Sequence, residues 1–326
     1  INTRVGVVIT LSLLSQDPLT NTPDMKNSDT SDSCVACRLS PQIARRNRRS
    51  VIALFLALEA IMAKVELRIL NRDQVESLIP GMDEIMALVE TGLSAHGCNE
   101  VVLPPKSHIQ LDDRYNGHFN VLLGWAGPID TAGVKVVGDY VDNYEHGLPS
   151  EVGLLTLYDP RTGTPKAFMD ATSITARRTG AVTGVGAKHL AQPDSRVLGH
   201  LGARGSAFSN IEAVCRQRPI EEVRINSKRL ETRERLAEQV RRDLGVNAIA
   251  VETAEQAVVG ADIVVEATRL ETPEILINDD WLHDRCLLIT FGWIMATDPR
   301  TVTAASKVVV DDWKQCTKGG QLQPLI

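Results

Sequence analysis

The stretch from Asp194 to Val214 constrains the fold of this chain more than any other part of the sequence. It reads DSRVLGHLGARGSAFSNIEAV, which is an apolar strand, a glycine-rich turn and the start of a helix. Val197, Leu198 and Leu201 are typical of a buried parallel strand. Glycines in the turn let the backbone approach a ligand closely. A helix that begins there directs free N–H groups and a positive dipole end toward an anion such as a pyrophosphate.

The turn departs at one position from the dinucleotide fingerprint G-x-G-x-x-G/A. The fingerprint would run from Gly202 to Ala207, and its second glycine is replaced by Arg204. The turn alone is equally compatible with a plain strand–turn–helix. Arg204 leaves two ways to hold a pyrophosphate, either through Gly205 and Ser206 or through Arg204 itself.

The sequence after the turn favours the dinucleotide site. Helical patterns alternate there with short apolar strands, which we expect at 222–226, 249–251, 262–268, 286–291 and 307–311. This alternation predicts a doubly wound parallel sheet of the α/β class. Ligands of such sheets bind beyond the C-terminal ends of the strands. The predicted cofactor-binding residues are therefore Gly202, Arg204, Gly205, Ser206, Asn226, Ser227, Lys228, Arg229, Ala267 and Thr268, together with Thr179 ahead of the turn.

The end of the second strand bears on the choice of cofactor. NAD sites place an acid there for the ribose hydroxyls, but this chain reads Asn226-Ser-Lys-Arg229 and has no acid. A serine and two cations suit a 2′-phosphate, which favours NADP(H). NAD(H) stays possible.

The segment before the turn has a different pattern. Strand-like runs on both sides of the turn sequence Asp159–Gly163 predict a hairpin, and the whole segment predicts a largely antiparallel sheet with helices. Lys135 is a lone charge in an apolar strand, either an edge lysine that guards against aggregation or a pocket cation that meets a carboxylate. Arg177 and Arg178 are expected in the first turn of a helix over 176–190, as a solvated pair or as an anion site.

Composition and charge exclude several classes of protein. The net charge of −6 and the lack of a basic stripe argue against a nucleic-acid partner. The six cysteines form no regular framework, which is typical of a reduced, cytoplasmic protein. Cys34 and Cys37 lack a second pair, so we predict no metal site. The apolar run at 51–62 is interrupted by Glu59 and too short to span a bilayer, so we predict no membrane association.

The chain resembles the ornithine cyclodeaminase/μ-crystallin family. The motifs that carry the resemblance lie between Val65 and Asp312, and their order and spacing are more specific than any single one. They are Pro104-Pro-Lys106, Gly133-Val-Lys-Val-Val137, Asp142-Asn143, Gly147-Leu-Pro149, Asp159-Pro-Arg-Thr-Gly163, Asp170-Ala-Thr172, Arg178-Thr-Gly-Ala-Val182, Ala187-Lys-His-Leu-Ala191 and the glycine turn.

The resemblance implies the organisation of the chain. It implies an α+β substrate-binding and dimerisation domain over 63–178 and an NAD(P)-binding Rossmann domain over 179–326, with more of that sheet expected beyond Ile326. Residues 1–62 are then expected to be a disordered or non-native leader, because a plausible start lies at Met62. A homodimer is expected.

The resemblance also implies a reaction. Arg178 matches an arginine that holds the substrate carboxylate, Lys106 stands where many members have an arginine on the same group, and Lys135 matches the active-site lysine. This set favours an enzyme that acts on a small amino or imino acid, and the favoured reaction is reduction of a 2-imino acid. The alternatives are ornithine cyclodeamination and non-catalytic binding of a small ligand with NADPH. The stretch from Thr290 to Thr297 lacks the acid–base aspartate of cyclodeaminases.

Overall fold

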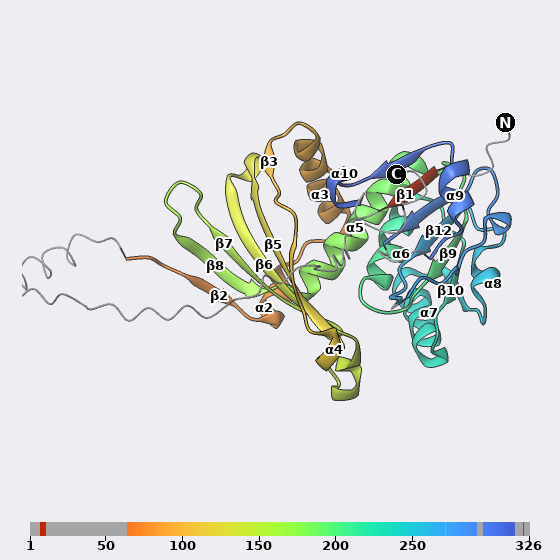
Figure 1. Cartoon of the computed structure of the whole chain (residues 1–326), viewed down its shortest axis with the longest axis horizontal. Helices are drawn as coiled ribbons and strands as arrows, with labels where there is room; N and C mark the ends of the chain where they lie inside the picture. The colour runs from red at the N-terminus through yellow and green to blue at the C-terminus, as the bar shows by residue number, and fades with distance from the viewer. Residues whose placement is uncertain (1–6, 11–63, 271, 292–295, 317–321, 323–326) are drawn as a thin grey trace, which may run out of the picture. The chain divides into compact units, whose positions relative to one another are not determined.

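The computed structural model describes residues 7–10, 64–270, 272–291, 296–316 and 322. The described residues form two seven-stranded sheets with helices (Figure 1). Both sheets belong to one compact unit that includes all described residues from Arg68 onward. None of the helices in the described ranges is long and apolar enough to cross a membrane.

The first sheet is largely antiparallel, as the sequence predicted. Its strands lie in the order β2-β8-β7-β6-β5-β3, with β4 paired to β5, and only β2 and β8 run parallel. The strands are β2 (Arg68–Leu70), β3 (Val101–Val102), β4 (Ser107–Gln110), β5 (Gly117–Ala126), β6 (Thr131–Tyr140), β7 (Glu151–Tyr158) and β8 (Pro165–Asp170). The helices between them are α2 (Arg72–Leu78), α3 (Met82–Gly97), α4 (Asp112–Tyr115), η1 (Gly127–Ile129) and η2 (Val141–His146).

The second sheet is parallel and doubly wound, which confirms the predicted fold class. Its order is β11-β10-β9-β12-β13-β1-β14. The strands are β1 (Val7–Thr10), β9 (Val197–Leu201), β10 (Glu222–Asn226), β11 (Asn247–Ala250), β12 (Ile263–Glu266), β13 (Leu287–Thr290) and β14 (Val308–Val310). The helices are α6 (Ala207–Gln217), α7 (Leu230–Leu244), α8 (Ala254–Val258), η3 (Asp279–Trp281), α9 (Pro299–Ala304) and α10 (Trp313–Cys316).

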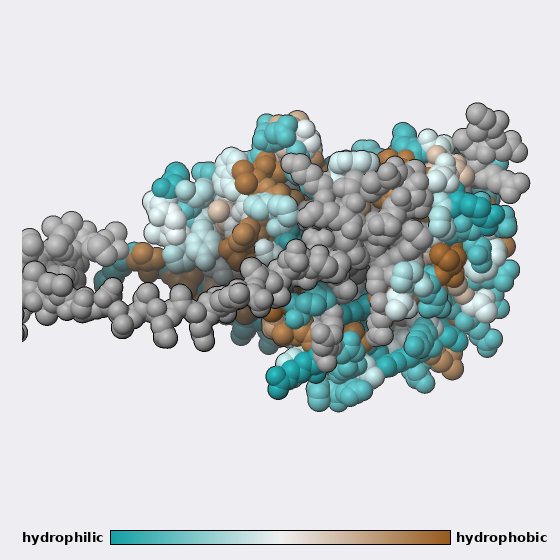
Figure 2. Space-filling model, in the orientation of Figure 1, coloured by the Kyte–Doolittle hydropathy of each residue, from teal (hydrophilic) through white to brown (hydrophobic). Residues whose placement is uncertain are grey.

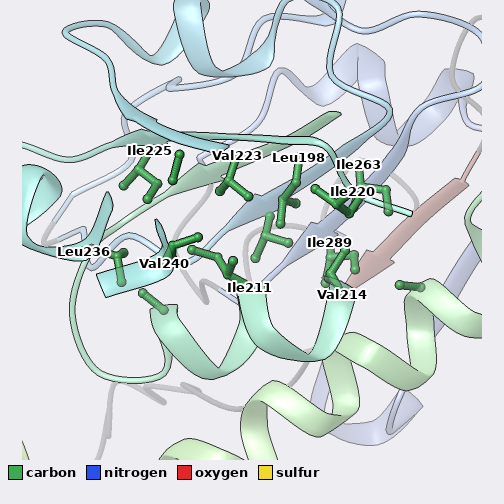
Figure 3. Packing of buried hydrophobic residues seen from close by; sticks show 14 of the residues in the cluster. Leu198, Ile211, Val214, Ile220, Val223, Ile225, Leu236, Val240, Ile263 and Ile289 are labelled. Atoms are coloured by element: carbon green, nitrogen blue, oxygen red, sulfur yellow. The ribbon is translucent and has the colours of Figure 1, made fainter. Parts of the chain in front are cut away.

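The largest core lies between this parallel sheet and the helices α6 and α7. Figure 3 shows strand residues such as Leu198 and Ile263 facing Ile211 and Val240 of the helices. These four side chains are fully buried. Each buried aliphatic side chain contributes about 1.5–3 kcal/mol relative to an exposed one. This core therefore fixes β9 and α6, and with them the glycine turn that joins the two.

The structure differs from the predicted leader at one point. Val7–Thr10 forms β1, which pairs in parallel with β13 on one side and with β14 on the other. A run of β-branched residues suits such a strand, because its backbone groups find partners on both sides. The rest of the predicted leader, residues 1–6 and 11–62 with Cys34 and Cys37, lies outside the described residues.

Helix α5 (Thr172–Leu190) corrects a second expectation. It begins four residues before the predicted start at Ala176, so Arg177 and Arg178 lie in its second turn rather than its first. It also runs through the predicted domain boundary between residues 178 and 179. The reason is packing: α5 must stay continuous to bring Gly180 and Gly184 against α6. A Cβ atom on Gly184 would lie 2.8 Å from that of Ala213.

We predict that the α5–α6 contact depends on Gly180. A Cβ atom there would overlap the backbone of Ser209, so Gly180→Ala forces the helices apart. Overpacking of this kind costs about 1–3 kcal/mol of unfolding free energy, measured by urea denaturation.

The matched control is Gly92→Ala in α3, where an added Cβ meets nothing within 4 Å. This substitution should raise stability by roughly 0.5–1 kcal/mol, as expected for an exposed helical glycine. Equal effects of the two substitutions would contradict the close contact.

Candidate active site

Lys135 lies in the middle of the first sheet. It is on β6, opposite Leu122 of β5 and Leu155 of β7. The interpretation as an edge lysine is therefore wrong, because β6 has a hydrogen-bonded strand on each side. The lysine Nζ donates a hydrogen bond of 3.2 Å to Oγ1 of Thr175 in the first turn of α5. Helix α5 thus covers the face of the sheet on which Lys135 lies.

The ammonium form of Lys135 is disfavoured. Burial and then the nearby Arg178 lower its pKa to about 6, although Glu151 opposes the shift. The amine is therefore mostly neutral at pH 7, and a neutral amine can accept a proton or a hydrogen bond from a ligand. A lysine perturbed in this way beside other charges is a candidate functional group.

Arg178 and Lys106 bring two more cations to the same place. The Nε of Arg178 is enclosed, and the side chain has no hydrogen-bond partner among the described residues. Burial lowers the pKa of Lys106 to about 8, with Arg178 as the second cause and Asp311 and Cys316 opposing. Glu151 and Asp311 act on Arg178 electrostatically, but an enclosed guanidinium that is hydrogen-bonded to no anion is costly. These cations therefore suit a carboxylate supplied by a ligand.

Four further residues of this site were not identified from the sequence. They are His118 on β5, Asp139 on β6, Glu151 on β7, and Arg269 in the loop after β12. Asp139 is the cross-strand partner of both His118 and Glu151. It accepts a short hydrogen bond from Arg269, and its carboxylate lies 3.8 Å from Nε2 of His118.

A signal for part of this set was present in the sequence. Side chains at even spacing share one face of a strand, so Asp139 had to lie on the side of Lys135. The pairing of Asp139 with Glu151 depends on the register of β6 and β7 across η2. That register is a tertiary property and gave no signal in the sequence.

The glycine turn has the geometry that a dinucleotide needs. Gly202 has φ +98° and Gly205 has φ +55°, a region that favours glycine. A Cβ on Gly202 would lie 2.5 Å from the carbonyl oxygen of Ala267, while one on Gly205 would meet nothing within 4 Å. The first glycine therefore allows the turn to pass the end of β12, and the second leaves room for a ligand.

His200 contacts both the glycine turn and helix α6. Burial lowers its pKa to about 4, so the imidazole is neutral. Its Nδ1 lies 2.8 Å from the carbonyl oxygen of Gly202, and its Nε2 lies 3.3 Å from the side-chain Nδ2 of Asn210 in α6. The neutral ring can therefore donate to the turn and accept from the helix.

The structure brings Asn226, Ala267 and Thr268 to the same edge of the parallel sheet as the glycine turn. Gly202 donates its N–H to the carbonyl of Asn226, and Ala267 donates its own to Leu201. The amide of Thr268 donates to Glu266. Thr179 is buried in α5 directly before Gly180. The Asn226 side chain donates a hydrogen bond to the carbonyl of Val251, and the Ser227 hydroxyl is hydrogen-bonded to that of Thr232.

A basic cluster lies next to the turn. The guanidinium of Arg229 lies 3.9 Å from the ring centroid of Tyr144 in η2, and that of Arg204 lies 4.7 Å from it. The pKa of Arg204 is lowered, first by partial burial and then by Arg229, with Arg235 adding to the effect. These mutually repelling cations suit a phosphate group. Together with the glycines, they show that the residues present fit a dinucleotide.

The chain matches known proteins over most of its length. Residues 65–325 match the model of the ornithine cyclodeaminase/mu-crystallin family. Alanine dehydrogenase of Archaeoglobus fulgidus is 32% identical over 271 residues, which are 79% of this chain and 78% of that protein.

Two solved structures are similar as well. Δ1-pyrroline-2-carboxylate reductase of Thermococcus litoralis, in complex with NADH and L-proline, is 31% identical with a TM-score of 0.68, over 72% of this chain and 73% of its own. An archaeal alanine dehydrogenase dimer with bound NAD is 29% identical with a TM-score of 0.69, over 78% of each chain.

We predict that Lys135 destabilises the fold. The unfolded chain keeps the lysine proton up to about its ordinary pKa of 10.5, and the folded chain loses it near 6. The unfolded state therefore binds more protons between these values, and the unfolding free energy contributed by Lys135 rises with pH across this window. Lys135→Met should raise the unfolding free energy by about 1–2 kcal/mol at neutral pH.

The gain should shrink as the pH approaches 10.5, and urea denaturation at pH 7 and pH 9.5 measures it. Lys166→Met is the control, because Lys166 lies exposed on β8. A pH-independent gain, or the same gain in the control, would contradict the prediction.

Proposed function

The chain belongs to the ornithine cyclodeaminase/mu-crystallin family, and on that premise we propose that it reduces the C=N bond of a small 2-imino acid with NAD(P)H. The observation that carries the proposal is the convergence of three side chains. An enclosed Arg178, the cation Lys106 and the largely neutral amine Lys135 meet on one face of the first sheet. This set matches a ligand that carries a carboxylate beside a nitrogen.

Each side chain has a defined part in the proposed reaction. Arg178 and Lys106 hold the carboxylate, which fixes the imine carbon and excludes rotation of the substrate. Lys135, already bonded to Thr175, contacts the reacting nitrogen. The glycine turn and the basic cluster hold the dinucleotide, which supplies a hydride to the imine carbon. The protein thus contributes position and electrostatics.

Turnover assays test the proposal. The purified chain should oxidise NADPH or NADH in the presence of cyclic imines such as Δ1-pyrroline-2-carboxylate, and Lys135→Met should abolish this while leaving cofactor affinity within about twofold. Production of proline and ammonia from ornithine would favour cyclodeamination instead. Cofactor binding without turnover of either substrate would favour a non-catalytic binder. Unchanged kcat in the Lys135 variant would remove this residue from the mechanism.

We propose NADP(H) as the preferred cofactor. The Arg229 and Arg204 guanidinium groups gather on Tyr144 at the end of β10, where the chain has no acid for a ribose hydroxyl. Lys228 is exposed beside them. A 2′-phosphate would relieve the repulsion between these cations, whereas an unsubstituted ribose would not.

Arg229→Ala should therefore weaken the binding of NADPH much more than the binding of NADH. We expect the Kd of NADPH to rise about tenfold, or about 1.4 kcal/mol, and that of NADH by less than about twofold, in a fluorescence titration. Arg242→Ala at the other end of α7 is the control, since this exposed arginine pairs with Asp243. Equal losses for both cofactors would reject the 2′-phosphate assignment.

We propose a cytoplasmic homodimer built on the outer face of the first sheet. The face opposite Lys135 carries exposed apolar side chains on β5, β6 and β7, namely Leu123, Val136, Val152 and Leu154, and Figure 2 shows apolar surface over this sheet. Contiguous exposed apolar residues mark protein interfaces.

Light scattering should give twice the mass of one chain, and Val136→Lys should give a single chain. Val259→Lys, at an exposed position outside this face, should stay dimeric. A monomeric wild type would contradict the proposal.

A further inference from the structure

Glu151 lies on the face of the first sheet that carries Lys135 and Asp139. It begins β7, is partly buried, and makes no hydrogen bond or ion pair with any described residue. Its cross-strand neighbour is another acid, Asp139. The charged groups that act on it are Asp139, Arg178, Lys135 and Arg269. Lys106, ahead of β4, and His118, on β5, are the other titratable groups that the structure brings to this site.

Asp139, the acid opposite Glu151 on this face, has partners for its charge. It is 4% exposed, pairs with Arg269, and has His118 on its other side. Its charge is already used within the protein. Glu151, one strand away, has no such pair, although Arg178 and Lys135 lie near enough to act on it electrostatically.

Arg178 and Glu151 act on each other electrostatically, but neither side chain makes a hydrogen bond or a close ion pair with a described residue. Two residues further along β7, the Gly153 N–H donates a hydrogen bond to Oγ1 of Thr172, so α5 begins next to this end of the strand. Partly buried charges that lack a hydrogen-bonded partner are costly, and a ligand that supplies a partner to both offsets this cost. A zwitterion with a carboxylate beside a cationic nitrogen does so.

We propose that Glu151 binds the positively charged nitrogen of the substrate, as a catalytic residue that protonates the imine and holds it as the iminium; this rests on the proposed function. The carboxyl proton of Glu151 moves to the imine nitrogen, which leaves a carboxylate facing an iminium. The dinucleotide, when bound in its reduced form, would supply the hydride for the iminium carbon, and the C=N electron pair would move to the nitrogen. The product is a neutral amine, and solvent returns a proton to the site.

The electrostatics of the site support this division of work. Burial and the charge of Asp139 raise the pKa of Glu151, so its carboxyl keeps a proton to a higher pH than an exposed glutamate. Lys135 is the opposite case, because its lowered pKa makes the ammonium scarce at neutral pH. The carboxyl of Glu151 can therefore supply a proton to the imine nitrogen.

A binding experiment separates the nitrogen from the rest of the ligand. L-Proline and cyclopentanecarboxylate share ring and carboxylate, but only proline carries a cationic nitrogen. In calorimetry with the oxidised cofactor bound, the wild type should bind proline at least tenfold more tightly. Glu151→Gln should remove this preference, whereas Arg178→Ala should weaken both ligands. Glu100→Gln, at an exposed position, should change neither.

A pH profile tests the catalytic part. The profile of kcat reports groups in the substrate complex. In Glu151→Gln the alkaline fall of kcat should move at least one pH unit lower, because the bound iminium loses its stabilising charge, while the KM of the imine at low pH stays within about threefold. A purely structural role would lower kcat at every pH without moving the profile.

Three results would overturn the proposal. The first is a wild type that binds proline no better than cyclopentanecarboxylate, or that binds neither ligand. The second is a Glu151→Gln variant that keeps the preference for proline. The third is a kcat profile that Glu151→Gln leaves unmoved. Thermal melting shows whether the variant is folded, and Glu151→Asp, which keeps the charge, should restore part of the proline preference. Imine turnover by the wild type tests the proposed function separately, so the two can fail independently.

Discussion

The close contact between α5 and α6 is the constraint on which the arrangement of the site depends. Gly180 has no side chain, so the two helices meet at the backbone of Ser209. The hydroxyl of Thr183 adds a hydrogen bond of 3.1 Å to Oδ1 of Asn210 and fixes the helices along their length. Arg178 and Thr175 belong to α5, which packs on the first sheet. Helix α6 begins at the glycine turn, which follows β9 of the second sheet. The cations of the first sheet are thereby held relative to the nucleotide turn by helix packing.

The chemistry of the site is a consequence of burying charge without full compensation. Lys135, Lys106 and Arg178 lie together: Arg178 lowers the pKa of both lysines, and Lys106 adds to the lowering at Lys135. Such an arrangement opposes folding, and the apolar core between the parallel sheet, α6 and α7 must offset it. The same cost makes the site receptive, since a ligand carboxylate or phosphate relieves it. Stability and binding are therefore linked through the same side chains.

The local patterns of the sequence were sufficient for much of the fold. The glycine turn, the alternating strands after it and the hairpin at 159–163 each depend on neighbours in the chain, so period and turn chemistry predict them. The start of α5 was predicted four residues late, because Ala171 and Thr172 carry no strong cap signal and tertiary contacts with Gly153 decide where the helix begins. The strand at Val7–Thr10 was missed because its partners are almost three hundred residues away.

The sequence by itself determined which chemical groups are present. It supplied the turn glycines, the replacement Arg204, the cations at 106, 135 and 178, and the absence of an acid at the end of β10. Only the tertiary structure decided between the two interpretations of Lys135, because edge or centre is a property of strand order. It alone brought Glu151 opposite Asp139 on the face that carries that lysine, and gathered Arg204 and Arg229 on Tyr144. Strand register and helix packing join residues far apart in the chain, and no local pattern encodes these distances.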